Sequence, residues 1–363
     1  MAGNIFGKIL TLTTFGESHG VAVGGIIDGF PSGLKIDLAF VQHELNRRRP
    51  GQSSLVSSRN EKDKVEFLSG LYNGVSLGTP IAFLVRNSDF KSSDYEHLKE
   101  VYRPSHADYT YESKYGVRDH RGGGRASARE TVARVIGGAL AKQFLDAFNI
   151  SVTAYVNQIG SVSTNKPYPE MDFDNIENSK VRCPDNVVSE KMIELIKKTA
   201  KDGDTLGGEI TCVIKNIPVG LGEPVFNKLN ADLANAIVGI NAVKGFEFGS
   251  GFASSLMTGS QHNDEFIFSN DAVHTTSNYS GGIQGGISNG EDIYFKAAFK
   301  PIATIMKSQQ TVDKHGNSVV VDGKGRHDVT VVPRAVPIVE AMAALVIADQ
   351  LLQNRASKLV NTI

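Results

Sequence analysis

The pentapeptide GESHG, residues 16–20, places Glu17, Ser18 and His19 between two glycines near the start of the chain. A histidine beside a serine suits the base of a nucleophile, a metal ligand, a general acid, or a turn without chemistry. The pentapeptide is not the G-x-S-x-G motif of serine hydrolases, because that motif joins a strand to a helix and a glycine-rich strand is expected here. Among these roles, that of a base for a serine nucleophile is therefore the least favoured for His19.

Arginines gather around the expected start of a helix at 127–147: Arg118, Arg121, Arg125, Arg129 and Arg134. Cations at a helix N-terminus oppose the helix dipole, and the free N–H groups there need acceptors. A phosphate would satisfy both requirements, so this segment predicts an anion site. A solvated basic loop, or an RNA contact made by RDHRGGGR, is the alternative.

A second run of arginines, residues 47–49, ends an expected helix. Arginines in a last helical turn favour the dipole without any ligand, so the run alone does not distinguish a binding site from a stable helix end. We expect Arg48 and Arg129 to converge on one anion site, because each needs an anion nearby if it is buried.

Two further segments carry histidine beside charged or aromatic residues. His106 lies in RPSHADYTYESKYG, where neighbouring tyrosines suit a planar cofactor, although a buried histidine with satisfied hydrogen bonds is the ordinary alternative. These tyrosines are Tyr109, Tyr111 and Tyr115. In GRHD, Asp328 either takes part in chemistry or forms an ion pair with Arg326 or Arg334.

The composition is that of an ordinary soluble protein, with 363 residues, 40% hydrophobic and 21% charged residues, and a net charge of −1. This charge gives no overall attraction to nucleic acid or to anionic membranes. Cys183 and Cys212 lack a CxxC spacing, which argues against a disulfide framework or a zinc site. There is no signal peptide pattern, and the apolar run at 341–348 is too short to span a bilayer, so we expect a cytoplasmic protein. The chain contains no P-loop, G-x-G-x-x-G or H-E-x-x-H motif.

The elements that must position these residues alternate between strands and helices. Periodicity predicts helices at 37–49, 127–147, 189–203, 224–240 and near 337–353. Strands are expected at 7–15, 20–33, 149–156, 209–217 and 291–301. Ser127 and Glu130 fit a capping box at the second helix. We expect one large α+β domain over residues 1–363.

The segments GESHG, RRRPG, RPSHADYTYESKYGVRDHRGGGRASARET, NAVKGFEFG, GGIQGGISNG and GRHD, in this order, resemble the chorismate synthase family. The resemblance runs from TFGESHG to VPRAVPIVEAM, and the long block at 103–131 is specific by itself. It implies a β-α-β sandwich assembled as a homotetramer. The implied reaction is the 1,4-elimination of phosphate and a C6 hydrogen from 5-enolpyruvylshikimate 3-phosphate, which gives chorismate, the last common intermediate of the shikimate pathway. Reduced FMN (FMNH2) is implied as the cofactor, with no net redox change.

The resemblance also implies roles for single residues. His19 would be the general acid for the departing phosphate, His106 would lie against the reduced flavin, and Asp328 would lie near its N5, where the C6 hydrogen is removed. The implied flavin-binding residues are Arg125, Ala126, Ser127, Asn241, Ala242, Gly285, Lys300, Pro301, Ile302, Ala303, Thr304 and Arg326. The implied substrate-binding residues are Ser18, Arg48, Arg103, Arg129 and Arg134, with Arg326 as a further candidate.

The chain departs from the family pattern at several positions. KPIAT at 300–304 replaces the KPTSS of many relatives, which removes two serine hydroxyls, and Ala126 stands where many relatives have serine. Ser54 stands where some have arginine, with Arg59 as a candidate substitute, and GRHDV replaces GRHDP.

Two other classes of protein remain as alternatives. An RNA-binding protein using the Arg-Gly loop would show a steep dependence of affinity on salt. A flavin oxidoreductase would need its own NAD(P)H site, for which no fingerprint is visible. The sequence leaves open whether the enzyme reduces its own FMN with NADPH or relies on another reductase.

Overall fold

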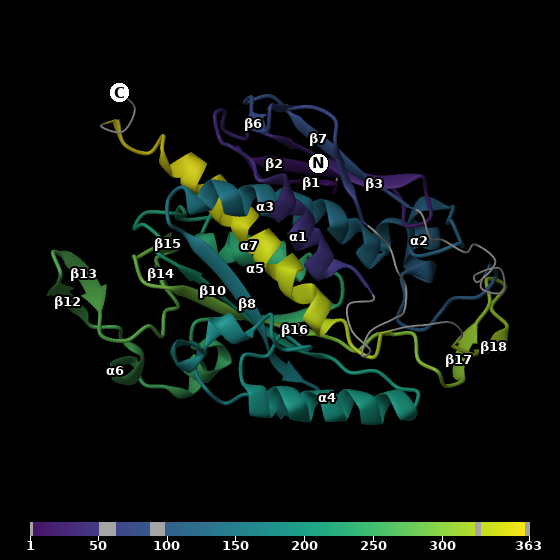
Figure 1. The fold of residues 1–363 in the computed structure, drawn as a ribbon. Helices are drawn as coiled ribbons and strands as arrows, with labels where there is room; N and C mark the ends of the chain where they lie inside the picture. Colours follow the sequence, from purple (N-terminus) through teal and green to yellow (C-terminus); the bar gives the residue numbers. More distant parts are fainter. Residues whose placement is uncertain (1–2, 51–62, 88–98, 324–327, 360–363) are drawn as a thin grey trace.

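Two antiparallel sheets enclose a layer of helices in the computed structural model, which describes residues 3–50, 63–87, 99–323 and 328–359 (Figure 1). The first sheet has the strand order β1-β2-β3-β7-β4, and the second has the order β11-β16-β10-β8-β9. The strands of the first sheet are β1 (Ile5–Phe6), β2 (Thr11–Phe15), β3 (Ala22–Asp28), β7 (Ile81–Arg86) and β4 (Val65–Phe67). Those of the second are β11 (Val243–Phe248), β16 (Ile293–Phe299), β10 (Gly208–Lys215), β8 (Ser151–Ile159) and β9 (Val162–Ser163). This is the β-α-β arrangement that the resemblance implied.

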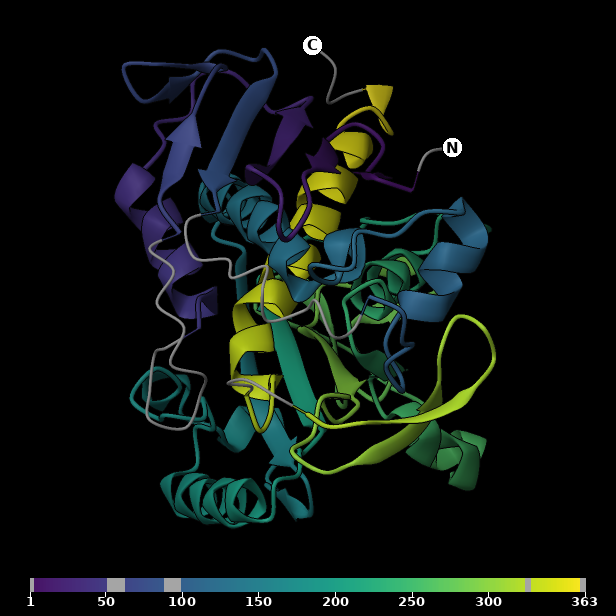
Figure 2. The ribbon, with the colours of Figure 1, turned by 90° about the vertical axis from the view of Figure 1, so that its right-hand side faces the viewer.

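Helices α1 (Leu38–Arg48), α3 (Thr131–Asp146), α5 (Leu229–Val238) and α7 (Val332–Asn354) form the middle layer. Helix α3 contacts β2 and β3 on one side and β8 on the other, and α7 runs through the middle of the molecule (Figure 2). The two helices approach closely at Gly138, where an added Cβ would lie 2.2 Å from the Cβ of Ala341. Helix α7 is long and apolar enough to cross a membrane, but 94% of its most apolar window is buried inside the protein, as expected of a core helix.

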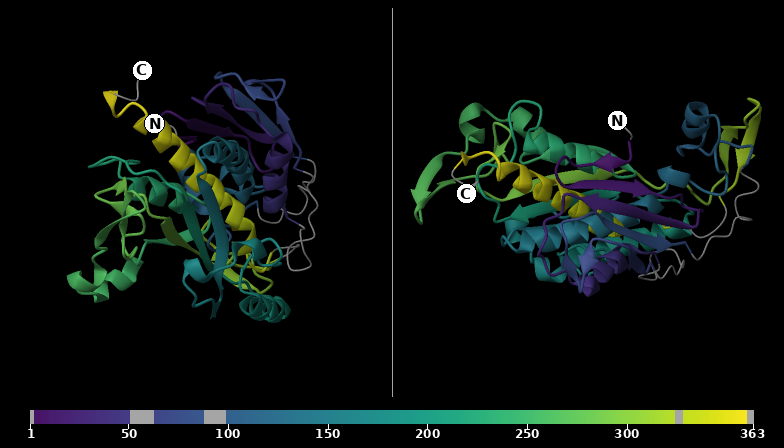
Figure 3. Two further views of the ribbon diagram at one scale, coloured as in Figure 1. Left: turned by 60° about the vertical axis from the view of Figure 1, so that its left-hand side comes forward. Right: turned by 90° about the horizontal axis from the view of Figure 1, so that it is seen from above.

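The remaining elements lie around this sandwich. Helix α4 (Asn186–Lys201) packs beside β9, and α2 (Asp108–Tyr115) lies near the hairpin of β17 (Gln309–Val312) and β18 (Ser318–Val321). The hairpin of β12 (Phe266–Ser269) and β13 (Ala272–Thr275) projects from the opposite end, next to α6 (Gly259–His262) (Figure 3). Two short hairpins complete the set: β5 (Leu71–Tyr72) with β6 (Val75–Ser76), and β14 (Ile283–Gln284) with β15 (Ile287–Ser288).

Most of the expected elements are confirmed. The carboxylate of Asp37 caps α1 by accepting from the backbone N–H groups of Ala39 and Phe40. The predicted apolar face of α3 is buried; its residues are Val132, Ile136, Leu140 and Phe144. The expected strand at 291–301 is β16, whose inward face is Ile293, Phe295, Ala297 and Phe299.

Three local predictions were wrong. Ser127 is an N-cap, but it caps a short 3-10 helix before α3, and the Glu130 carboxylate accepts from Arg134 instead of completing a capping box. The helix predicted at 224–240 begins only at Leu229, whose backbone N–H donates to the carbonyl of Gly286. Helix α7 begins five residues before the predicted Pro337, with Pro333 in its first turn.

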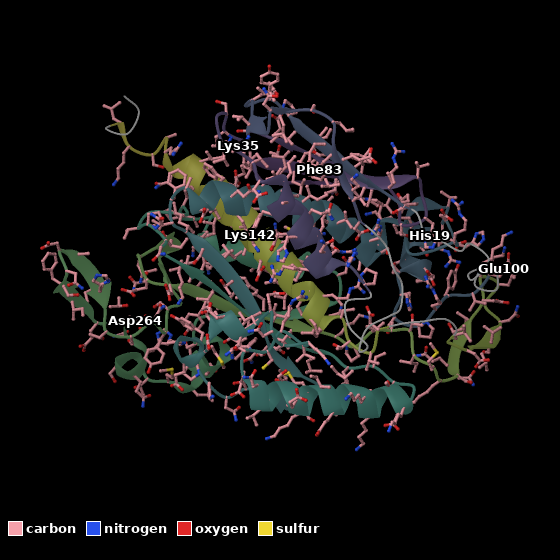
Figure 4. All side chains as sticks on the ribbon, in the orientation of Figure 1. His19, Lys35, Phe83, Glu100, Lys142 and Asp264 are labelled. Carbon is pink, nitrogen blue, oxygen red and sulfur yellow. The ribbon has the colours of Figure 1, made fainter. Side chains whose placement is uncertain are left out.

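A cluster of buried charges lies inside the helix layer, with Lys142 near the centre of the molecule (Figure 4). The Glu340 carboxylate of α7 accepts from Arg47 Nη1 at 2.5 Å and Nη2 at 3.2 Å, from Lys142 Nζ at 2.6 Å and from the backbone N–H of Ala154 at 3.0 Å. Glu44 also pairs with both Arg47 and Lys142. This cluster, called the buried charge cluster below, joins α1, α3, α7 and β8.

Candidate active site

A cavity of about 790 Å³ lies where the turn at 16–21 meets segments from distant parts of the chain. Most of the predicted site residues line it, although they are spread over more than 300 positions. Those that line it are Ser18, His19, Arg48, Arg103, His106, Ala126, Ser127, Arg129, Asn241, Ala242, Lys300, Pro301, Ile302, Ala303, Thr304 and Asp328.

Three predicted residues do not line the cavity. Arg125 instead donates to the carbonyl of Gly16 at 3.2 Å and to the hydroxyl of Thr14 at 2.5 Å, so it braces the end of β2. Arg134 pairs with Glu130 at 3.1 Å, and Gly285 lies in the turn between β14 and β15. Arg326, Ser54 and Arg59 lie outside the described residues.

His19 is held tightly against the Arg-Gly loop. Its Nδ1 lies 3.0 Å from the hydroxyl oxygen of Ser18. A Cβ added to Gly122 would lie 2.1 Å from His19 Nδ1 and 2.2 Å from Cε1, so the ring packs directly on the glycine backbone. The turn leads from β2 into β3 with no following helix, which confirms that this is not a nucleophile elbow.

His106 is a neutral ring with a defined tautomer. Its Nδ1 lies 3.0 Å from the carbonyl oxygen of Pro104, which only accepts, so Nδ1 carries the proton. Its Nε2 then accepts from the hydroxyl of Thr304 at 3.1 Å. Burial, and secondly the charge of Arg103, lower the pKa of His106 below its ordinary value of 6.5.

This lowered pKa predicts a pH dependence of stability. Between the ordinary and the lowered pKa, the unfolded chain binds a proton at His106 that the folded protein does not, so folding stability falls as the pH drops through about 6.5. We expect the melting temperature of the wild type to fall more between pH 7 and pH 5 than that of His106→Gln. Histidine C–H resonances in NMR, assigned by the same variant, should show the His106 transition below the ordinary value of 6.5. A His106 transition at or above pH 6.5 would contradict the prediction.

The two arginine groups converge, as predicted, and the anion between them belongs to the protein. Asp63 accepts from Arg48 Nη1 at 3.3 Å and from Arg129 Nη1 at 2.5 Å, and its side chain is fully buried. Arg48 also donates to the hydroxyl of Thr131 and to the carbonyl of Ala128. The arginines are thus held in place by the protein before any ligand binds.

Arg103 is held in a similar way. Its Nε and Nη2 donate to the two carboxylate oxygens of Asp108 at 2.7 and 2.8 Å, and Arg118 adds a contact at 3.1 Å. Burial would raise the pKa of Asp108, but the hydrogen bonds and charge of Arg103 outweigh it and lower that pKa. Asp108 is therefore ionised, and Arg118 also pairs with Glu112 at 3.5 Å.

Asp328 lies on the cavity wall and pairs with Nη1 of Arg334, so the ion pair considered as its ordinary alternative is formed. Arg334 Nε also donates to the backbone carbonyl of Arg48 at 3.2 Å. The carboxylate is consequently fixed relative to the last residue of α1. This contact does not exclude a chemical role, because Asp328 also borders the cavity.

One part of the wall has an unsatisfied acceptor. The side-chain nitrogen of Asn241 donates to the carbonyl of Ala126 at 3.0 Å, which turns its Oδ1 the other way. This oxygen is buried and has no hydrogen-bond partner among the described residues. The segment 300–304 also lines the cavity and keeps a hydroxyl at Thr304, so the expected loss of both serine hydroxyls of KPTSS was wrong. Of the tyrosines near His106, Tyr111 alone among the described residues lines the cavity.

Several site residues escaped sequence analysis. Asp63, Asn87, Asp108 and Thr131 hold the predicted residues, but none forms a recognisable local motif with them. The basic segment RDHRGGGR also differs from an RNA-binding strip, because its arginines are engaged within the protein: Arg118 pairs with Asp108, Arg121 with Asp119, and Arg125 with Thr14.

Comparisons with known proteins agree with this geometry. The family model for chorismate synthase matches residues 10–352. A chorismate synthase of Christiangramia forsetii is 60% identical over 359 residues, which cover 99% of this chain and 100% of that protein. One of Phocaeicola vulgatus is 59% identical over 98% of this chain and 99% of its own. A crystal structure of a chorismate synthase superposes with a TM-score of 0.78 at 32% identity, covering 96% of this chain and 94% of that one.

Proposed function

Because the chain belongs to the chorismate synthase family, we propose that its cavity binds 5-enolpyruvylshikimate 3-phosphate together with reduced FMN. The family makes the protein an enzyme of the shikimate pathway, a lyase that acts on a small molecule. The observation that carries the finer proposal is the convergence of Arg48 and Arg129 beside His19 and His106 around one cavity.

The charge of the cavity suits this substrate, which carries a phosphate and two carboxylates. Arg48 and Arg129 share the carboxylate of Asp63 and line the cavity, and Lys300 adds a further positive charge to its wall. Arg103, held by Asp108, also lines the cavity. Arginine binds phosphate and carboxylate through parallel N–H donors, which fixes the orientation of the bound anion as well as its affinity.

The described residues also fit a flavin. The Oδ1 of Asn241, which has no hydrogen-bond partner among the described residues, would accept from a donor group of the bound flavin. Ala126, Ser127, Asn241, Ala242 and the segment 300–304 would hold the cofactor. When bound, reduced FMN supplies electron density to the breaking C–O bond of the substrate.

The chain itself supplies the proton transfers. His19, oriented by Ser18 and Gly122, donates a proton to the departing phosphate oxygen. Asp328, oriented by Arg334, takes up or relays the proton lost from C6 of the substrate. His106, whose Nε2 accepts from Thr304, also lines the cavity and would contact the bound flavin.

Self-association is supported by apolar side chains that project near the β12–β13 hairpin. Phe252 is 78% exposed, Leu256 89%, Phe266 65% and Phe268 73%. All four lie within residues 252–268, and exposed apolar side chains concentrated in one part of a protein are typical of an interface. We propose that this end contacts further copies of the chain in a homotetramer, and that the protein acts in the cytoplasm.

The test is an anaerobic assay of chorismate and phosphate formation with reduced FMN and the enolpyruvyl substrate. We expect both products in equal amounts, and none with oxidised FMN alone. A parallel reaction with oxidised FMN and NADPH as the only reductant tells a self-reducing enzyme from one that needs another reductase. Folded protein that releases no phosphate with reduced FMN would contradict the proposal. RNA binding with a steep salt dependence would favour the alternative.

A further inference from the structure

The side-chain amide of Asn87 joins two parts of the cavity. Its nitrogen donates to the carbonyl oxygens of Glu17 at 3.0 Å and Gly20 at 2.8 Å, which flank His19 in the turn. Its oxygen accepts from Nε of Arg129 at 2.9 Å. Asn87 therefore contacts both the segment that carries the histidine and one of the two arginines that share Asp63.

Strand pairing places Asn87 at this point. Strands β3 and β7 are antiparallel with Ala22 opposite Arg86, so the residue after β7 lies beside the turn that precedes β3. The backbone N–H of Asn87 donates to the carbonyl of Val21 at 3.0 Å, which extends the ladder by one residue. The side chain is thus fixed by the sheet, and a site built on a sheet is held more accurately than one on a loop.

The contacts also determine which side chain can serve here. Backbone carbonyls only accept hydrogen bonds and a guanidinium only donates them, so the amide nitrogen faces the turn and the oxygen faces Arg129. Aspartate would keep the acceptor and lose both donors, and leucine would lose all three contacts. The asparagine amide supplies both the donors for the turn and the acceptor for Arg129.

We propose that Asn87 is a positioning residue that holds the His19 turn in register with the anion-binding arginines. The contacts run without a gap from the turn through Asn87 and Arg129 to Asp63 and Arg48. A proton donor and the group it protonates must keep a fixed separation, and a displacement of about 1 Å can lower a rate on the order of 10²-fold. The inference rests on the proposed function, because it takes His19 as the acid and the arginines as substrate ligands.

The test compares Asn87→Leu and Asn87→Asp with the wild type in the anaerobic assay. We expect kcat per folded molecule to fall on the order of 10²-fold in both, because both lose the donors to the turn. KM should rise more in Asn87→Asp, because the new negative charge opposes anion binding beside Arg129. The pH profile of kcat should also shift, since it reports the proton donor. A purely structural role would lower the melting temperature and leave kcat per folded molecule and its pH profile unchanged.

The matched control is Arg86→Gln, one residue earlier, which breaks an exposed ion pair with Glu66 and should leave kcat unchanged. Near-wild-type kcat in both Asn87 variants would overturn the proposal, whereas an inactive wild type would overturn the proposed function instead.

An NMR titration with inorganic phosphate is independent of turnover. Phosphate should shift the His19 signal in the wild type and shift it less in Asn87→Leu. If neither variant folds, the NMR signal of the Asn87 side-chain amide is followed in the wild type instead. If phosphate leaves that signal unshifted, the proposal is overturned.

Discussion

Replacing His19 with glutamine is expected to lower kcat by about 10²–10⁴-fold, the range commonly lost with a positioned general acid. The protein should still fold, because the His19 ring lies at the cavity and outside the core. The measurement is phosphate release at saturating substrate and reduced FMN, together with the melting temperature. The loss should appear in kcat rather than in KM, because the proton is transferred only as the C–O bond breaks.

A second variant tests the position of the ring while keeping the imidazole. In Gly122→Ala the added Cβ would lie 2.1 Å from His19 Nδ1, so the ring must move. We expect kcat to fall here as well, although the acid is still present. Gly259→Ala is the matched control, because a Cβ at Gly259 meets nothing within 4 Å. Wild-type kcat in both His19→Gln and Gly122→Ala would remove His19 from the mechanism.

Replacing Glu340 with alanine should reduce the free energy of unfolding by about 3–5 kcal/mol, the usual effect of removing one partner from a buried ion pair. Lys142 would then have Glu44 as its carboxylate partner, and Arg47 would have Glu44 and Glu177. Burial would raise the pKa of Glu340, but the charges of Arg47 and Lys142 outweigh it and lower that pKa to about 2. The stabilisation is therefore complete above the ordinary pKa of 4.5 and is lost as the pH falls toward 2.

Urea denaturation at fixed protein concentration measures this effect. Wild type and Glu340→Ala should differ most at pH 7 and converge as the solution is acidified. The control is Glu66→Gln, which breaks the exposed pair with Arg86 and should cost less than about 1 kcal/mol. If Glu340→Ala lost no more stability than this control, the buried charge cluster would not stabilise the fold.

The sequence predicted those parts of the site that carry their own chemistry. Arg48 and Arg129 were identified because arginines at helix ends either bind an anion or interact favourably with the helix dipole. Their convergence on one carboxylate is confirmed. Asp63 and Asn87 could not be predicted in this way. Their roles arise from contacts between segments that are distant in sequence, such as the pairing of β3 with β7, and no spacing within one segment reports such contacts.

The same reason explains the errors in local structure. Glu130 has the right spacing for a capping box with Ser127, but Arg134 one turn later is a charged donor, and the carboxylate accepts from it. The segment at 224–228 was expected to be helical, yet the Glu223 N–H donates to the carbonyl of Asn227 and Leu229 docks on Gly286. Periodic core faces, such as that of α3, were predicted correctly because burial of one face decides them.

The adjacency of Arg47 and Arg48 limits how this protein can adapt to heat. Arg47 belongs to the buried charge cluster, whereas Arg48, the next residue of α1, belongs to the cavity. Replacing a buried ion cluster with well-packed apolar residues often makes a protein more stable. Here such repacking would shift the last turn of α1, and Arg48 would move with it. We therefore expect selection for thermal tolerance in this protein to change its surface and loops while leaving the cluster in place, because stability and activity share one helical turn.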